Sequence, residues 1–173
     1  MCVSLNRFYY YVLVGERMDN NDFYTFTEYM KKDENTLTAS MEDYLEMIYR
    51  LSAANGFTRI VELSQALNIQ PSSATKMVQR LAEKGYIKYE KYGFLMLEER
   101  GKQVGAWLLK RHTIIDNFMR MIGVKESEIM EETEKIEHML SSDSTDCFES
   151  LLTFMMSNPD VMSRFINFKT GSA

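Results

Sequence analysis

The sequence predicts a mainly α-helical protein in which a winged helix-turn-helix unit is followed by an all-α part. Apolar residues recur at helical spacing over most of the chain from residue 40 onward. The pattern changes to alternation only around Lys91-Tyr92-Gly93, with Ile87 and Tyr89 on one side and Leu95 and Leu97 on the other. Two short helices followed by such a hairpin form the winged helix-turn-helix plan, in which the second helix enters the major groove of DNA.

Capping and breaking residues set the expected bounds of each helix. Ser40 is the expected N-cap of the first helix, with Asp43 at the third helical position as in a capping box. Pro71 suits the first turn of the third helix and Gly85 ends it, while Gly123 breaks the fourth. The expected helices cover about 40–54, 60–67, 71–84, 99–122, 126–140, 144–156 and 159–168.

These patterns divide the chain into three parts. Residues 1–39 form an N-terminal extension without sustained helical periodicity, and we assign it no function. An alternative natural start is Met30, which leads directly into the first helix. Residues 40–110 form the expected winged helix-turn-helix domain, and residues 111–173 the expected all-α domain.

Composition and charge fit an intracellular DNA-binding protein. Cys2 and Cys147 are too few and too far apart for a disulfide framework, and no apolar stretch approaches the roughly 20 residues that span a bilayer. We therefore expect a cytoplasmic protein without a membrane segment. The net charge is −5, but residues 59–111 carry ten Lys and Arg against five Asp and Glu, which gives +5 there and −10 elsewhere. A basic segment between acidic ones is expected of a DNA reader with a separate regulatory part.

The third helix has one face for the core and one for DNA. Ala74, Met77, Val78 and Leu81 can pack inward. An ordinary amphipathic surface helix would show the same pattern, but the hairpin and the basic segment favour DNA binding. The candidate DNA contacts are Ser72, Ser73, Thr75, Lys76, Gln79 and Arg80 on the helix, with Lys91 and Tyr92 in the wing.

Carboxylates and both histidines of the chain form a second candidate site. Glu134, Glu137 and His138 project within an arc of about 100° on one helix. The other candidate ligands are Asp43, Glu46 and His112. Acidic helix faces are often only solvated, but both histidines lie near these clusters. Donors without thiolate favour Mn²⁺ or Fe²⁺, while Zn²⁺, Co²⁺ or Cd²⁺ can also bind. A helical enzyme with a di-metal centre is an alternative, but the chain lacks the Glu-x-x-His repeats of such bundles.

Residues 40 to about 168 resemble the diphtheria-toxin-repressor-like family of metal-dependent regulators, and within it the manganese transport regulators. The resemblance rests on an ordered set of motifs: Ser40-Met-Glu-Asp43-Tyr-Leu-Glu46, Pro71-Ser-Ser-Ala-Thr-Lys-Met-Val-Gln79, Tyr89-Glu-Lys-Tyr92, Arg111-His112 and Ile136-Glu137-His138. The chain departs from the family pattern in its N-terminal extension, at Gly93-Phe94 in the wing tip and at Glu98, where the family commonly has a helix-capping Thr or Ser.

The resemblance implies a two-metal site and a regulatory function. It implies Asp43, Glu46 and His112 as ligands of one ion and Glu134 and His138 of the other, with Glu137 as the bridge. An aspartate at 43 and the lack of an SH3-like third domain favour Mn²⁺, about two ions per subunit. The implied function is a homodimeric repressor of metal-uptake genes that binds double-stranded operator DNA when Mn²⁺ is bound. It is not an enzyme and takes no small organic substrate. Alternatives are an iron-responsive repressor and a winged-helix regulator that senses no metal.

Overall fold

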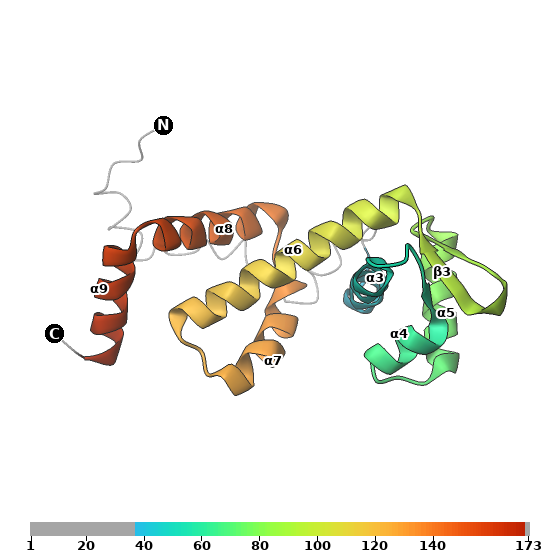
Figure 1. Ribbon diagram of the computed structural model, residues 1–173, viewed down its shortest axis with the longest axis horizontal. Coiled ribbons are helices and arrows are strands. Elements are labelled where there is room, and N and C mark those ends of the chain that lie inside the picture. Colours follow the sequence, from blue (N-terminus) through green and yellow to red (C-terminus); the bar gives the residue numbers. More distant parts are fainter. Residues whose placement is uncertain (1–36, 172–173) are drawn as a thin grey trace, which may run out of the picture. The chain divides into compact units, whose positions relative to one another are not determined.

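The computed structural model describes residues 37–171, which form seven α-helices and one small sheet (Figure 1). The expectations for residues 1–36, including the alternative start at Met30, lie outside the described residues. Within them the predicted fold class is confirmed: a winged helix-turn-helix is followed by helices alone. No helix in the described range is both long enough and apolar enough to cross a membrane.

Three helices and a three-stranded sheet make up the winged helix-turn-helix. Helix α3 covers Ala39–Ser52, α4 covers Ile60–Ala66 and α5 covers Pro71–Glu83. The expected N-cap of α3 was wrong by two residues: Thr38 is extended and its hydroxyl oxygen accepts from the amide of Met41. Ser40 therefore lies within the first turn. Pro71 opens α5 as expected.

The wing is an antiparallel hairpin with a third, short strand beside it. Strands β2, Ile87–Tyr89, and β3, Phe94–Leu97, pair with Lys88 opposite Met96. The sequence did not predict β1, Thr58–Arg59, which pairs with the other edge of β3. Two residues are too short to show a period of alternation, so only the pairing in the fold reveals this strand.

Helix α6, Glu99–Ile122, runs through two hydrophobic clusters. Its first half contributes Leu108 to the core of the winged unit. Its second half contributes Ile114 and Ile115 to a smaller cluster in the helical part. The start of the helix lies close against the wing and requires a glycine there. A Cβ atom on Gly101 would lie 1.9 Å from the backbone oxygen of Tyr86.

The remaining helices are α7, Glu126–Glu137, α8, Ser142–Ser157, and α9, Pro159–Thr170. Helix α7 ends three residues before the expected position, with His138 as its C-cap. Helix α8 begins two residues earlier than expected because the Ser141 hydroxyl accepts from the amide of Ser144. Ile129 and Thr133 of α7 are buried, and Ile129 belongs to the same cluster as Ile114 and Ile115 of α6.

Candidate metal centre and nucleic-acid interface

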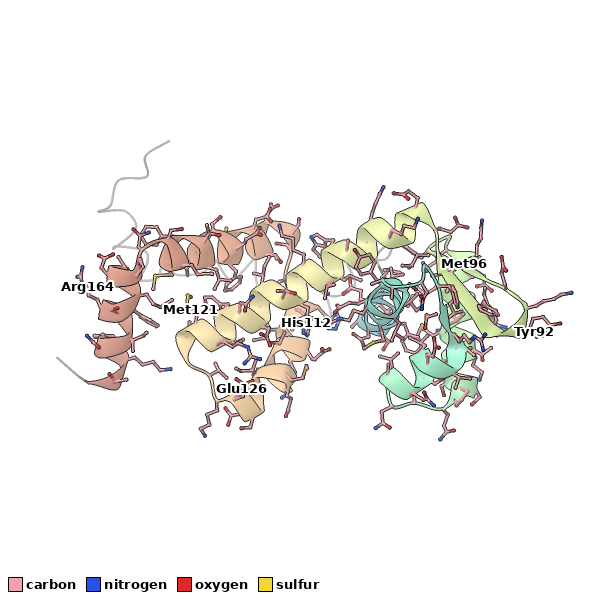
Figure 2. All side chains as sticks on the ribbon, in the orientation of Figure 1. Tyr92, Met96, His112, Met121, Glu126 and Arg164 are labelled. Atoms are coloured by element: carbon pink, nitrogen blue, oxygen red, sulfur yellow. The ribbon has the colours of Figure 1, made fainter. Side chains whose placement is uncertain are left out.

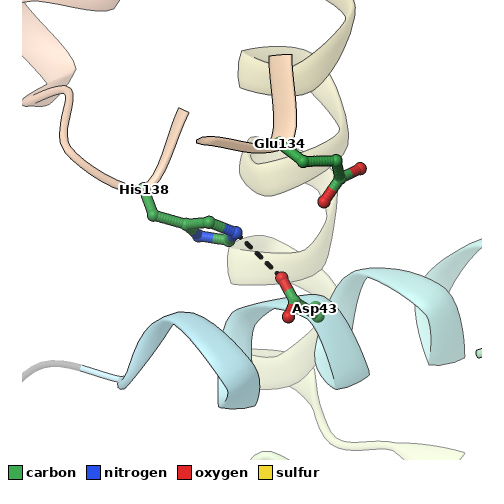
Figure 3. Close-up of side chains that lie close together, drawn as sticks. All are labelled: Asp43, Glu134 and His138. Atoms are coloured by element: carbon green, nitrogen blue, oxygen red, sulfur yellow. Dashed lines mark ion pairs between the residues drawn. The ribbon is translucent and has the colours of Figure 1, made fainter. Parts of the chain in front are cut away.

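Three helices bring the six predicted metal ligands together. Asp43, Glu134 and His138 form one group, and Glu46, His112 and Glu137 form the other. In each group the candidate ligand atoms all lie within 4.8 Å of one another. Figure 3 shows the first group, with Asp43 on α3 facing His138 at the end of α7. Both groups therefore join α3 of the winged unit to α7 of the helical part.

This grouping differs from the one that the family resemblance implies. Asp43 lies with Glu134 and His138, whereas the resemblance places it with Glu46 and His112. Asp43 and Glu46 are three residues apart on a helix, so their backbone positions are offset by about 4.5 Å along its axis. Asp43 and Glu46 therefore belong to different groups. Glu137 lies in the same group as His112.

The group around His112 is the more deeply buried of the two. Glu46 and His112 are each 8% exposed and Glu137 only 1%. His112 Nδ1 lies 2.9 Å from Glu137 Oε2, and Figure 2 marks His112 midway along α6. The hydrogen bond to Glu137 raises the pKa of His112, although burial opposes the shift. In this arrangement the imidazole offsets part of the negative charge of the two carboxylates.

Two carboxylates hold the ring of His138. Its Nε2 atom lies 2.8 Å from Asp43 Oδ1, and its Nδ1 atom lies 2.8 Å from Glu42 Oε2. These two contacts raise the pKa of His138 to about 10, and the contact with Asp43 has the larger effect. The pKa of the Glu134 carboxyl is also raised, because burial and the nearby charge of Glu137 favour its neutral form.

The donor set fits a divalent cation of hard or intermediate character. It consists of carboxylate oxygens and imidazole nitrogens, which suit Mn²⁺ and Fe²⁺ and also accept Zn²⁺ and Co²⁺. A cavity of about 170 Å³ opens onto five of the six ligands, all but His138. Arg50 lines the same cavity. The residues present can therefore hold metal ions between α3, α6 and α7.

Glu42 and Arg111 surround the predicted ligands without being ligands themselves, a role that the sequence alone did not reveal. Arg111 is 2% exposed, donates to Glu42 over 2.7 Å and lies 4.8 Å from the ring centroid of Trp107. Burial raises the pKa of Glu42, but hydrogen bonds from His138 and Arg111 outweigh it and leave the pKa below its usual value. Each residue directly precedes a predicted ligand in sequence. Helical neighbours point about 100° apart, however, so the polar helix faces that carry the predicted ligands do not include these two residues.

The predicted DNA contacts lie on the outer face of α5 and in the wing. Ala74, Val78 and Leu81 are fully buried, and Met77 packs against the same core. The candidates exposed on the other face are Ser72, Ser73, Lys76, Gln79 and Arg80. Thr75 is half-buried and its hydroxyl donates to the carbonyl of Pro71 over 2.9 Å, which leaves it less available for DNA.

The wing tip projects away from the core. Lys91 is exposed, and Tyr92 is 92% exposed at the end of the hairpin (Figure 2). Tyr92 has a φ of +66°, a left-handed conformation that is uncommon for a bulky residue. Glu98 is the N-cap of α6 and makes no side-chain capping hydrogen bond; its carboxylate instead lies 3.5 Å from the ammonium group of Lys88.

Comparison with known proteins identifies the family. Residues 36–95 match the N-terminal DNA-binding domain of the iron-dependent repressors, and residues 98–165 match their metal-binding and dimerisation domain. The HTH-type transcriptional regulator MntR of Lysinibacillus sphaericus is 44% identical over 133 residues, which are 77% of this chain and 96% of the relative. A winged unit that shares a ligand cluster with a helical domain defines a metal-responsive transcription regulator. The chain belongs to the iron-dependent repressor family.

Solved structures share the same fold. The manganese regulator SloR superposes with a TM-score of 0.60 at 24% identity, covering 68% of this chain and 55% of that one. ScaR with bound Zn²⁺ gives a TM-score of 0.56 at 26% identity, covering 66% and 54%. The IdeR protein of T. acidophilum gives 0.56 at 23% identity, covering 68% and 55%.

Removal of the Arg111 guanidinium should destabilise the junction of the helices. Arg111→Met leaves the half-buried Glu42 carboxylate with His138 alone, so we expect the free energy of unfolding to fall by about 3 kcal/mol. Urea denaturation of the metal-free protein measures this free energy of unfolding. Lys110→Met is the matched control, because Lys110 pairs with Glu149 at the surface and should change little.

A double variant separates the ion pair from general packing. Glu42→Gln removes the charge that Arg111 balances, so the two substitutions together should cost less than the sum of the single losses. Strictly additive losses, or an equal loss in Lys110→Met, would show that the buried ion pair does not stabilise this junction.

Proposed function

We propose that this chain is a manganese-responsive transcriptional repressor of metal-uptake genes that binds operator DNA as a homodimer in the cytoplasm. The observation that carries the proposal is the position of the two ligand groups, each of which joins α3 to α7. We assign DNA binding to residues 40–110, and metal binding and dimerisation to residues 111–173. The MntR relative, which is described as an HTH-type transcriptional regulator, supports the regulatory function.

The proposed metal ligands are the six residues in the two groups: Asp43, Glu46, His112, Glu134, Glu137 and His138. Two groups of three ligands support two ions per subunit. The preference for Mn²⁺ is supported by donors that are oxygen and imidazole nitrogen without thiolate. SloR is described as a manganese regulator and ScaR as a manganese-activated repressor. Fe²⁺, Zn²⁺, Co²⁺ and Cd²⁺ are the competing ions to test.

Metal control of DNA binding would follow from the connection between helices. A bound divalent cation supplies positive charge and ligand bonds that offset the repulsion among the carboxylates. Asp43 and Glu46 lie on the first helix of the winged unit, so their engagement with α7 restrains that unit against the helical part. In a dimer, this restraint sets the separation of the two recognition helices, which helix-turn-helix dimers place about one DNA turn apart.

The DNA-reading residues are proposed on the exposed face of α5 and in the wing. Lys76 and Arg80 supply positive charge for phosphates, and Gln79 supplies an amide for base edges. Ser72 and Ser73 lie at the helix N-terminus, where hydroxyl and amide groups can hold a phosphate. The remaining proposed contacts are Thr75, Lys91 and Tyr92.

A second copy of the chain is the proposed partner of the helical part. The match of residues 98–165 to a dimerisation domain supports this pairing. Helix α8 also exposes Leu151 and Phe154, which lie three residues apart on one side of the helix and are 44% and 52% accessible in the single chain. Exposed apolar side chains that lie together on one helix face are typical of a surface that associates.

Two alternatives remain, each with an observation in its favour. The buried contacts among Arg111, Glu42 and His138 already connect α3, α6 and α7, which favours a regulator that needs no metal. The family description favours iron as the signal. Equal DNA affinity with and without chelator would support the first alternative. Stimulation of DNA binding by Fe²⁺ at a lower concentration than Mn²⁺ requires would support the second.

Loss of one central ligand should abolish the metal response without unfolding the chain. Glu137→Gln retains an acceptor for His112 Nδ1 but replaces a carboxylate with a poor metal ligand. We expect Mn²⁺ affinity to fall more than about 100-fold, and Mn²⁺-stimulated DNA binding to disappear. Fluorescence anisotropy of a duplex that the wild-type chain binds, with thermal melting as the folding check, measures both. Glu132→Gln, on the same helix but outside both groups, should respond normally. A normal response of Glu137→Gln would refute the ligand assignment.

Loss of one phosphate contact should weaken binding to all sequences alike. Lys76→Ala removes an exposed cation on α5, so the slope of log affinity against log salt should become shallower by about 0.9. A salt series with specific and unrelated duplexes measures this slope. Lys135→Ala, which removes a cation on α7 paired with Glu131, is the control and should leave it unchanged. An unaltered slope for Lys76→Ala would mean that α5 does not face the DNA backbone.

A further inference from the structure

We infer that Arg50 is a built-in competitor of the metal ion and sets the metal concentration at which the Glu46–His112–Glu137 group fills. The inference rests on the proposed metal-responsive function and deepens it. Arg50 Nε lies 2.9 Å from Glu46 Oε1, and its Nη2 atom contacts the same oxygen. A positive charge within the chain therefore already binds a carboxylate that is a candidate metal ligand.

The burial of its partner distinguishes this ion pair from an ordinary surface pair. The Glu46 side chain is only 10% exposed, and Arg50 lines the same cavity as Glu46, His112 and Glu137. An exposed pair at this helical spacing contributes little, because water screens it. A charged hydrogen bond to a largely buried carboxylate is stronger, and an ion arriving at Glu46 has to compete with it.

A cation and a guanidinium cannot both bind this carboxylate without cost. A divalent ion next to Arg50 would meet a like charge inside a cavity, where the repulsion is larger than in water. Arg50 can withdraw because 37% of its side chain is exposed and its stem is long and flexible. It also lies in the last turn of α3, where the helix carbonyls offer it a favourable alternative position.

The consequence is a weaker and therefore adjustable metal site. Protons compete with metal ions for their ligands, and an internal guanidinium competes in the same way but independently of pH. The competitor leaves the ligand set itself intact. It raises the free metal concentration that is needed to join α3 to α6 and α7 at this group.

The test is a Mn²⁺ titration of the full chain, in which electron paramagnetic resonance reports the free ion. Arg50→Met removes the charge and keeps an apolar stem, and we expect one of the bound ions to bind about tenfold more tightly. Arg50→Lys retains a cation and should stay near the wild-type affinity. Arg120→Met is the matched control, because Arg120 pairs with Asp116 at the same spacing on α6 but outside both ligand groups.

The possible outcomes are distinct. Tighter binding in Arg50→Met alone supports the inference. Unchanged or weaker binding in Arg50→Met, or an equal gain in Arg50→Lys or Arg120→Met, overturns it and leaves the proposed function standing. A wild-type chain that binds no Mn²⁺ overturns the proposed function and this inference together. Thermal melting of each metal-free variant confirms that the differences in affinity do not come from unfolding.

Discussion

The arrangement of α3, α6 and α7 depends on the need of buried carboxylates for a cation. Glu46 and Glu137 are nearly excluded from solvent, and their candidate ligand atoms lie within 4.8 Å of each other. Two like charges about 5 Å apart repel by roughly 3 kcal/mol at an effective dielectric constant near 20. Without a metal ion, His112 and Arg50 supply the opposing charge. Any cation that binds there changes how strongly the three helices are held together.

Helix α6 supplies the frame on which this balance acts. Leu108 packs in the core of the winged unit, and Ile115, about two helical turns later, packs in the helical cluster. His112 lies between these two residues on the same helix. A change in charge at the site is therefore transmitted to packed helices and not to a loop. The Arg111–Glu42 pair adds a contact that does not require metal, so this ion pair already connects α6 to α3.

Sequence reasoning reached the fold class because helical and alternating periods are local properties of the chain. It also selected six residues that the fold brings together, since chemistry and helical spacing place them on common faces. It could not find β1, whose two residues form a strand only against β3. It missed Arg50 and Arg111 for a similar reason. Their roles come from partners on a buried surface, and an arginine in a helix is ordinarily a solvated residue.

We propose that metal joins the first helix of the DNA-binding unit to the helical domain. Hydrogen–deuterium exchange of the full chain, with and without Mn²⁺ and followed by peptide, tests this proposal. We expect the amides of α3 and α7 to gain protection together over the same range of Mn²⁺ concentration. Protection confined to α7, or no change in either helix at saturating Mn²⁺, would contradict it.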